Sequence, residues 1–153
     1  MAIRNIVQEG DEVLRKKCFE VDKIDEKIIT LLDDMKETLI KADGAGLAAP
    51  HVGVLRRIFI VSAENKYYEC INPKIISSSG TQNGAEGCLS VKGKFGNVVR
   101  PMNVTVKALD RFGKEFKVKA TGFLARAFCH ENDHLDGVLY IDKAIDLQEE
   151  KWE

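Results

Sequence analysis

The spacing of apolar residues most constrains what this chain can fold into. After Ile24 the apolar residues recur at steps of three and four, which is the spacing of one buried face of a helix. They are Ile28, Leu31, Leu32, Met35, Leu39 and Ile40. Asp22 and Asp25 are placed to cap the start of this helix, and Gly44 is placed to end it. The pattern predicts an amphipathic helix over about residues 24–43.

A different pattern follows, in which short runs rich in β-branched and aromatic residues alternate with polar turns, as in antiparallel strands. These runs cover residues 57–62, 67–76, 104–109 and 116–118. The glycine-rich segment 44–53 and the polar segment 77–84 predict loops. Thr121 can cap a second helix over about residues 122–135, and Gly137 follows its end. We therefore expect an α+β fold with mostly antiparallel sheets packed around a central helix.

Composition excludes several classes of protein. The chain has 153 residues, of which 44% are hydrophobic and 31% charged, so we expect a single domain over residues 1–153 with its own core. Its 23 basic and 24 acidic residues nearly cancel, which argues against direct binding to nucleic acid or to a membrane surface. No apolar run is long enough to cross a bilayer, and the first residues lack the apolar core of a secretory signal. We expect a cytoplasmic protein whose four cysteines are thiols.

The strongest chemical signal is His130-Glu131-Asn132-Asp133-His134 on the second predicted helix. Residues four apart lie one turn apart on the same helix face, so both imidazoles can share one metal ion. Glu131 lies about 100° round the helix from His130, where it can reach a metal-bound water without being a ligand. The third of the chain's 3 histidines, His51, lies in the glycine-rich segment. The alternative is a chance pattern on a solvated helix.

A tetrahedral site needs a third protein ligand, which the residues alone leave open. After His134 the chain offers acidic residues such as Glu149 and Glu150, which a small metalloprotease would use as the third ligand. Upstream, Cys88 follows a glycine and lies just ahead of a predicted strand, where a thiolate could line a cleft. A lone cysteine is more often a core residue than a ligand.

Three ordered motifs resemble those of the peptide deformylases, which remove the formyl group from the N-terminal formylmethionine of new bacterial and organellar proteins. Gly44–Pro50 matches the family loop Gly-x-Gly-Leu-Ala-Ala-Pro, with His51 where the family has glutamine. Glu86–Ser90 reads Glu-Gly-Cys-Leu-Ser, and His130–Gly137 has the family form of the histidine pair. The flanks at residues 3–15 and 122–142 are also similar, so the resemblance covers nearly the whole chain.

The resemblance implies a role for each residue of these motifs. The ligands of one divalent metal would be Cys88, His130 and His134. Glu131 would be the general acid and base. The backbone N–H of Leu89, together with His51 in place of the family glutamine, would stabilise the oxyanion.

The resemblance also implies how substrate binds. Gly46, Leu47 and the neighbouring loop backbone would pair with an extended N-formylmethionyl nascent peptide. Phe123 and Ala127 would contribute to an apolar pocket for the methionine side chain. Two imidazoles and a thiolate can hold Fe(II), Zn(II), Ni(II) or Co(II), and the resemblance favours Fe(II).

Departures from the family pattern leave alternatives open. Besides His51, Lys92 stands where many members have proline, and Cys129 stands where glutamine is common; we expect Cys129 to pack in the core. The end of the chain, Leu147–Glu153, is too short and acidic to support docking on the ribosome. The alternatives to an active deformylase are a divergent metal-binding paralogue with reduced or altered hydrolytic activity and a small metalloprotease.

Overall fold

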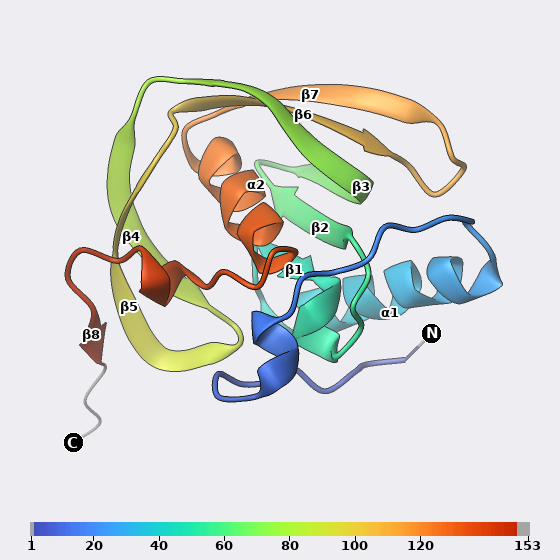
Figure 1. Cartoon of the computed structure of the whole chain (residues 1–153), viewed down its shortest axis with the longest axis horizontal. Helices are drawn as coiled ribbons and strands as arrows, with labels where there is room; N and C mark the ends of the chain where they lie inside the picture. The colour runs from blue at the N-terminus through green and yellow to red at the C-terminus, as the bar shows by residue number, and fades with distance from the viewer. Residues whose placement is uncertain (1, 150–153) are drawn as a thin grey trace.

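The computed structural model of the chain describes residues 2–149, in which two antiparallel sheets enclose a central helix (Figure 1). The five-stranded sheet has the order β1-β2-β3-β6-β7, and the three-stranded sheet has the order β4-β5-β8. The helices are α1 (Glu26–Ala42) and α2 (Phe123–His134), with 3-10 turns η1 (Glu12–Arg15), η2 (Ala49–Val52) and η3 (Tyr140–Asp142). The strands are β1 (Gly46–Ala48), β2 (Ile58–Ala63), β3 (Lys66–Ser79), β4 (Gln82–Cys88), β5 (Val91–Arg100), β6 (Asn103–Leu109), β7 (Glu115–Thr121) and β8 (Gln148–Glu149). The expected α+β fold with antiparallel sheets is confirmed.

The first predicted helix is confirmed as α1, with changes at its ends. The carboxylate of Asp25 accepts a hydrogen bond from the Ile28 N–H at 3.2 Å, so Asp25 is the cap and Asp22 is not. The helix ends at Ala42, and its C-cap Asp43 takes the left-handed conformation, one residue before the expected Gly44. Ile40 is 68% exposed, although the spacing placed it on the buried face, because it lies at the edge of the apolar stripe in the last turn.

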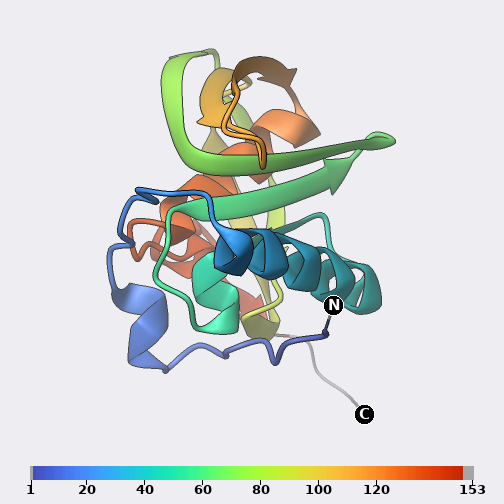
Figure 2. The ribbon, with the colours of Figure 1, turned by 90° about the vertical axis from the view of Figure 1, so that its right-hand side faces the viewer.

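The strand β2 is buried on both faces because a helix covers each of them. Phe59 and Val61 pack in the same core cluster as the α2 residues, while Ile58 and Ile60 pack with the residues of α1. The helix α1 lies along one side of the sheet (Figure 2). This burial explains why β2 reads as a continuous apolar run rather than an alternating one.

The prediction of a loop at residues 44–53 is wrong in part. Gly46–Ala48 forms the edge strand β1, in which Gly46 pairs with Val61 of β2. A 3-10 turn follows immediately and ends at Gly53, whose φ of 81° favours glycine. The exposed hydrogen-bonding edge of β2 recruits these small residues into the sheet, which local composition does not reveal.

The prediction of a loop at residues 77–84 is also wrong. The strand β3 continues to Ser79, and β4 begins at Gln82, so only a tight turn separates them. The polar strand ends are stabilised by pairing, for example of Ser77 with Thr105 of β6. The strand expected after Cys88, whose bounds the sequence left open, is β5; it pairs with β4 and brings the end of β4 beside α2.

The helix α2 is buried around most of its circumference and lies between the two sheets (Figure 1). Its N-cap is Gly122, with no side-chain hydrogen bond, and Thr121 is instead the last residue of β7. Phe128 packs against Phe59 of β2 with ring centroids 5.9 Å apart. The two sheets and the core around Phe128 therefore hold α2 in place.

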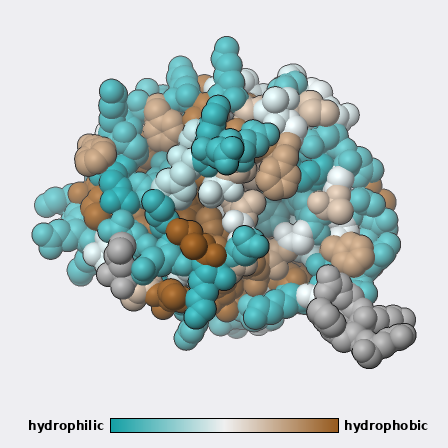
Figure 3. Space-filling view, turned by 180° about the vertical axis from the view of Figure 1, so that it is seen from behind, coloured by the Kyte–Doolittle hydropathy of each residue, from teal (hydrophilic) through white to brown (hydrophobic). Residues whose placement is uncertain are grey.

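Hydrophilic side chains cover much of the surface, with apolar side chains scattered between them (Figure 3). Within residues 2–149 no helix is long and apolar enough to cross a membrane.

Candidate active site

A cavity of about 320 Å³ opens beside α2, between the edge strand β1 and the end of β4. It is lined by the predicted site residues except His134 and Leu47, whose side chains are buried. The side chain of Leu47 packs in the core with the residues of α1, so Leu47 offers the cavity only its backbone. A larger groove, about 720 Å³, lies beside the start of α1 but has no histidine or cysteine among its lining residues. Of these two cavities, only the smaller is lined by histidine and cysteine side chains, so it is the candidate active site.

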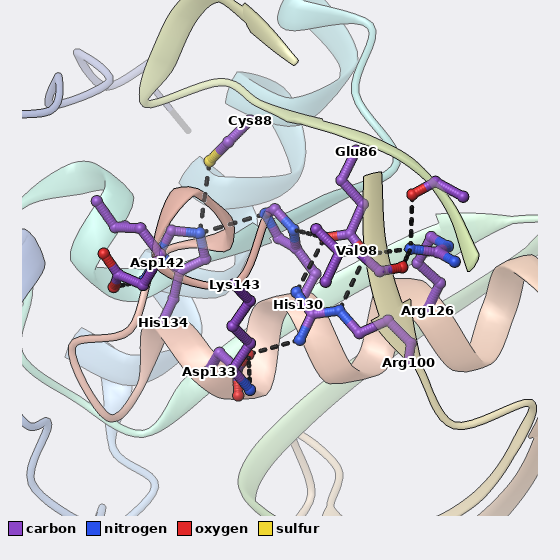
Figure 4. A network of polar contacts seen from close by, with 12 residues as sticks. Glu86, Cys88, Val98, Arg100, Arg126, His130, Asp133, His134, Asp142 and Lys143 are labelled. Atoms are coloured by element: carbon purple, nitrogen blue, oxygen red, sulfur yellow. Dashed lines mark hydrogen bonds and ion pairs between the residues drawn. The ribbon is translucent and has the colours of Figure 1, made fainter. Parts of the chain in front are cut away.

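The thiol of Cys88 lies against the imidazoles of α2 (Figure 4). Its Sγ atom is 3.4 Å from Nε2 of His134, and that Nε2 is 3.3 Å from Nε2 of His130. Two nitrogens bound to one tetrahedral ion are separated by about 3.3 Å, and a nitrogen and a sulfur by about 3.5 Å. The distances from Nε2 of His134 to its two neighbours therefore match those between ligands of one metal ion.

Potential ligand atoms gather in two overlapping groups within residues 2–149. One group contains His51, Cys88 and His134, and the other contains His130, Glu131 and His134, with all atoms of a group within 4.8 Å of one another. His134 belongs to both groups, so the metal-ligating positions centre on its Nε2 atom.

A buried carboxylate orients the first histidine of the pair. Nδ1 of His130 lies 2.9 Å from Oε1 of Glu86, which leaves Nε2 of His130 turned toward the site. Glu86 accepts two hydrogen bonds of 2.9 Å from Arg100 and one of 2.5 Å from Arg126. Burial raises the pKa of Glu86, but the hydrogen bonds from Arg100 and His130 outweigh it and bring the pKa to about 2. Glu86 is therefore ionised at neutral pH.

The electrostatics of the site favour a thiolate. Burial raises the pKa of Cys88, but hydrogen bonds with the three histidines outweigh it and hold that pKa well below its usual value. Burial and the neighbouring His51 lower the pKa of His134 to about 3, so this imidazole is neutral. Thiolate and neutral imidazole are the forms that bind metal. Burial lowers the pKa of His130, but contacts with Cys88 and Glu86 raise it to about 10, so metal must displace a proton there.

Comparison with known proteins agrees with this geometry. Residues 3–150 match the model of the family described as polypeptide deformylase. A peptide deformylase of Clostridium botulinum is 53% identical over 143 residues, which cover 94% of this chain and 97% of that protein. One of Caldicellulosiruptor bescii is 52% identical over 145 residues, covering 95% of this chain and 87% of that protein.

Solved structures agree as well. The crystal structure of peptide deformylase from Thermotoga maritima has a TM-score of 0.92 and 37% identity, covering 95% of this chain and 100% of that chain. That of a peptide deformylase from Legionella pneumophila has a TM-score of 0.90 and 45% identity, covering 93% of this chain and 86% of that chain. The chain belongs to the peptide deformylase family.

This deformylase is therefore a hydrolase that removes the formyl group from the N-terminal formylmethionine of new polypeptides. The family is metal-dependent, and the donor atoms described above are the candidate ligands. Nothing favours the divergent paralogue or the metalloprotease.

Glu131 of the deformylase is buried against the edge strand β1. A Cβ atom on Gly46 would lie 2.6 Å from Oε2 of Glu131, so only glycine leaves room for this carboxyl group. Burial raises the pKa of Glu131, although His130 and His51 oppose the rise. Its Oε1 atom is buried and has no hydrogen-bond partner among residues 2–149. Such a carboxyl group is suited to taking up and releasing a proton.

The other predicted residues lie in two places. Leu89 follows Cys88 at the end of β4 and lines the cavity, as do Ala127 and the half-exposed Phe123. Cys129 is buried in the core cluster, where burial raises its pKa to about 11, in agreement with a packing role.

Sequence reasoning missed the residues that hold Glu86. Arg126 lies four residues before His130, and helical spacing alone places both on one face of α2. Arg100 ends β5 and reaches Asp133 at 2.6 Å as well as Glu86. A buried guanidinium group signals a carboxylate partner only once the fold is known.

Proposed function

We propose that this deformylase holds one divalent metal with Cys88, His130 and His134. The single observation that supports the proposal best is the spacing about Nε2 of His134, 3.4 Å to Sγ of Cys88 and 3.3 Å to Nε2 of His130, beside the buried carboxyl group of Glu131. Fe(II) is the metal that the family resemblance favours, and Zn(II), Ni(II) and Co(II) suit the same donors.

When bound, the metal supplies a Lewis acid that activates water and polarises the formyl oxygen. Glu131 accepts a proton from the attacking water and delivers it to the amine that leaves. A carbon–oxygen bond forms, the formyl carbon–nitrogen bond breaks, and formate and a free N-terminal amine result. The backbone N–H of Leu89 and the Nε2–H of His51 stabilise the oxyanion.

Two sheet edges support the proposed mode of peptide binding. Among residues 2–149, β1 pairs only with β2 and β4 pairs only with β5, so each has an edge that is open for pairing with another strand. Both edges border the cavity, through Gly46 on one side and Ala85 on the other. An extended nascent peptide adds to such an edge through backbone hydrogen bonds, which tolerates many sequences. Its methionine side chain would lie against Phe123 and Ala127.

The wider setting is also part of the proposal. The chain acts as one catalytic domain in the cytoplasm, on N-formylmethionyl nascent peptides, without direct binding to nucleic acid or membrane. We propose no ribosome docking through the acidic end of the chain, of which residues 150–153 lie outside the described part.

Metal analysis combined with release of formate from formyl-Met-Ala-Ser tests these roles. Cys88→Ala and His134→Ala should each lose the metal, because a thiolate or an imidazole ligand is removed. Glu131→Gln should keep the metal and lose turnover, because an amide cannot take up the proton. Full metal content and activity in Cys88→Ala would show that Cys88 is not a ligand.

A further inference from the structure

The position at which this chain departs from its family places an imidazole against the candidate metal ligands. His51 lies in the 3-10 turn η2, directly after β1, and is 1% exposed. Its Nε2 atom lies 3.4 Å from Sγ of Cys88, and its ring centroid is 4.1 Å from that of His134. A fourth metal ligand would also lie about 3.5 Å from a ligating sulfur. Distance alone therefore does not separate a ligand from a hydrogen-bond donor.

The protonation of the ring separates the two roles. Nδ1 of His51 lies 2.8 Å from the backbone nitrogen of Ala48 and 3.1 Å from its carbonyl oxygen. The Ala48 N–H can only donate, so Nδ1 is the acceptor of the shorter contact. A neutral imidazole carries one proton, which must then be on Nε2. Protonation of the whole ring would also leave a proton on Nε2. In both states Nε2 is a donor that faces sulfur and lacks the free electron pair that a metal requires.

We propose that in the protein without substrate His51 donates a hydrogen bond from Nε2–H to the thiolate of Cys88 and so tunes a metal ligand; the same proton turns to the oxyanion only when substrate reacts. This inference rests on the proposed role of Cys88. Donation from an N–H group lowers the electron density that sulfur gives to the metal, which makes the metal a stronger Lewis acid. His51 is thus a positioning and tuning residue toward Cys88.

NMR spectroscopy of the protein loaded with a spin-active cadmium isotope and labelled at its histidine nitrogens tests the proposal directly. We expect a proton bound to Nε2 of His51, with a scalar coupling from that proton to cadmium through sulfur. The His51→Gln variant assigns the signals by their loss. A direct coupling between Nε2 and cadmium without the proton would make His51 a ligand and overturn the proposal. An Nε2 proton without coupling to cadmium would overturn it as well.

A second measurement uses the charge-transfer band between thiolate and metal in the protein loaded with Co(II). Without the hydrogen bond the sulfur electrons lie higher in energy, so the band of His51→Ala should move to longer wavelength. His51→Gln, which restores an N–H donor of similar reach, should return the band toward its wild-type position. Cys129→Ala is the control and should leave the band unchanged, because Cys129 lies in the core.

Affinity for Co(II), measured by competition with a chelator, should fall about ten- to a hundredfold in His51→Ala, as for other partners of metal ligands. A band at the same wavelength in wild type, His51→Ala and His51→Gln would overturn the inference while leaving the proposed ligand set intact. Absence of any thiolate-to-metal band in the wild type would overturn both the inference about His51 and the assignment of Cys88 as a ligand.

Discussion

Replacement of Glu86 by glutamine tests how strongly the buried polar network beneath the site stabilises the fold. The Glu86 side chain is 4% exposed, and its carboxylate contacts Arg100, Arg126 and His130. Glutamine has nearly the same shape but no charge. The variant would leave two buried guanidinium groups facing a neutral amide.

The loss in free energy of unfolding expected for Glu86→Gln can be estimated in two ways. The pKa of Glu86 falls from its ordinary value of 4.5 to about 2. At about 1.4 kcal/mol for each unit of pKa, the charged contacts contribute roughly 3 kcal/mol. Removing one partner of a buried ion pair typically costs about 3–5 kcal/mol. We therefore expect the free energy of unfolding at neutral pH to fall by about 3–4 kcal/mol in Glu86→Gln.

The same shift predicts a pH dependence. Because the pKa of Glu86 is lower in the folded than in the unfolded chain, its contribution is fully present above pH 4.5 and is lost as the pH falls through about 2. Wild type should lose this stability in that window. Glu86→Gln has no carboxyl group at this position and should not show that part of the loss.

Urea unfolding of chelator-treated protein, followed at pH 7 and across the acid range, measures both effects. The matched control is Glu115→Gln, since Glu115 pairs with Lys107 at 3.1 Å but its side chain is 55% exposed. An exposed pair contributes little, so this control should change the free energy of unfolding by less than about 1 kcal/mol. A Glu86→Gln variant as stable as the control would refute the reasoning.

Four further substitutions test the site and the core. Gly46→Ala should reduce formate release about 10²–10⁴-fold at unchanged metal content, because the new methyl group displaces the Glu131 carboxyl; unchanged turnover would mean that Glu131 can move freely. Phe128→Ala should lower the free energy of unfolding in urea by about 3–5 kcal/mol, since its ring is fully buried. Phe112→Ala, at an 86% exposed residue, should leave it nearly unchanged, and equal losses would contradict the assigned core. Cys129→Ala should keep wild-type metal content and turnover, and loss of metal would give this thiol a role in the site.

The sequence by itself determined the features that depend on neighbours along the chain. The buried apolar face of α1 and its cap at Asp25 follow from residues spaced three or four apart. The shared helix face of His130 and His134 follows from the same spacing. Helix geometry converts such spacings directly into positions in space. The residues alone did not decide whether Cys88 is the third ligand. The family motif, rather than any local physical signal, identified it.

Only the tertiary structure decided which distant residues meet. Glu86 contacts His130 across 44 residues, and Cys88 contacts His51 across 37, distances along the chain over which no periodicity operates. The small residues of β1 and the polar ends of β3 and β4 became strands because open edges of neighbouring strands needed hydrogen-bond partners. The contact of the His51 ring with Cys88 was decided in the same way, by the turn η2 that carries His51 to the end of β4.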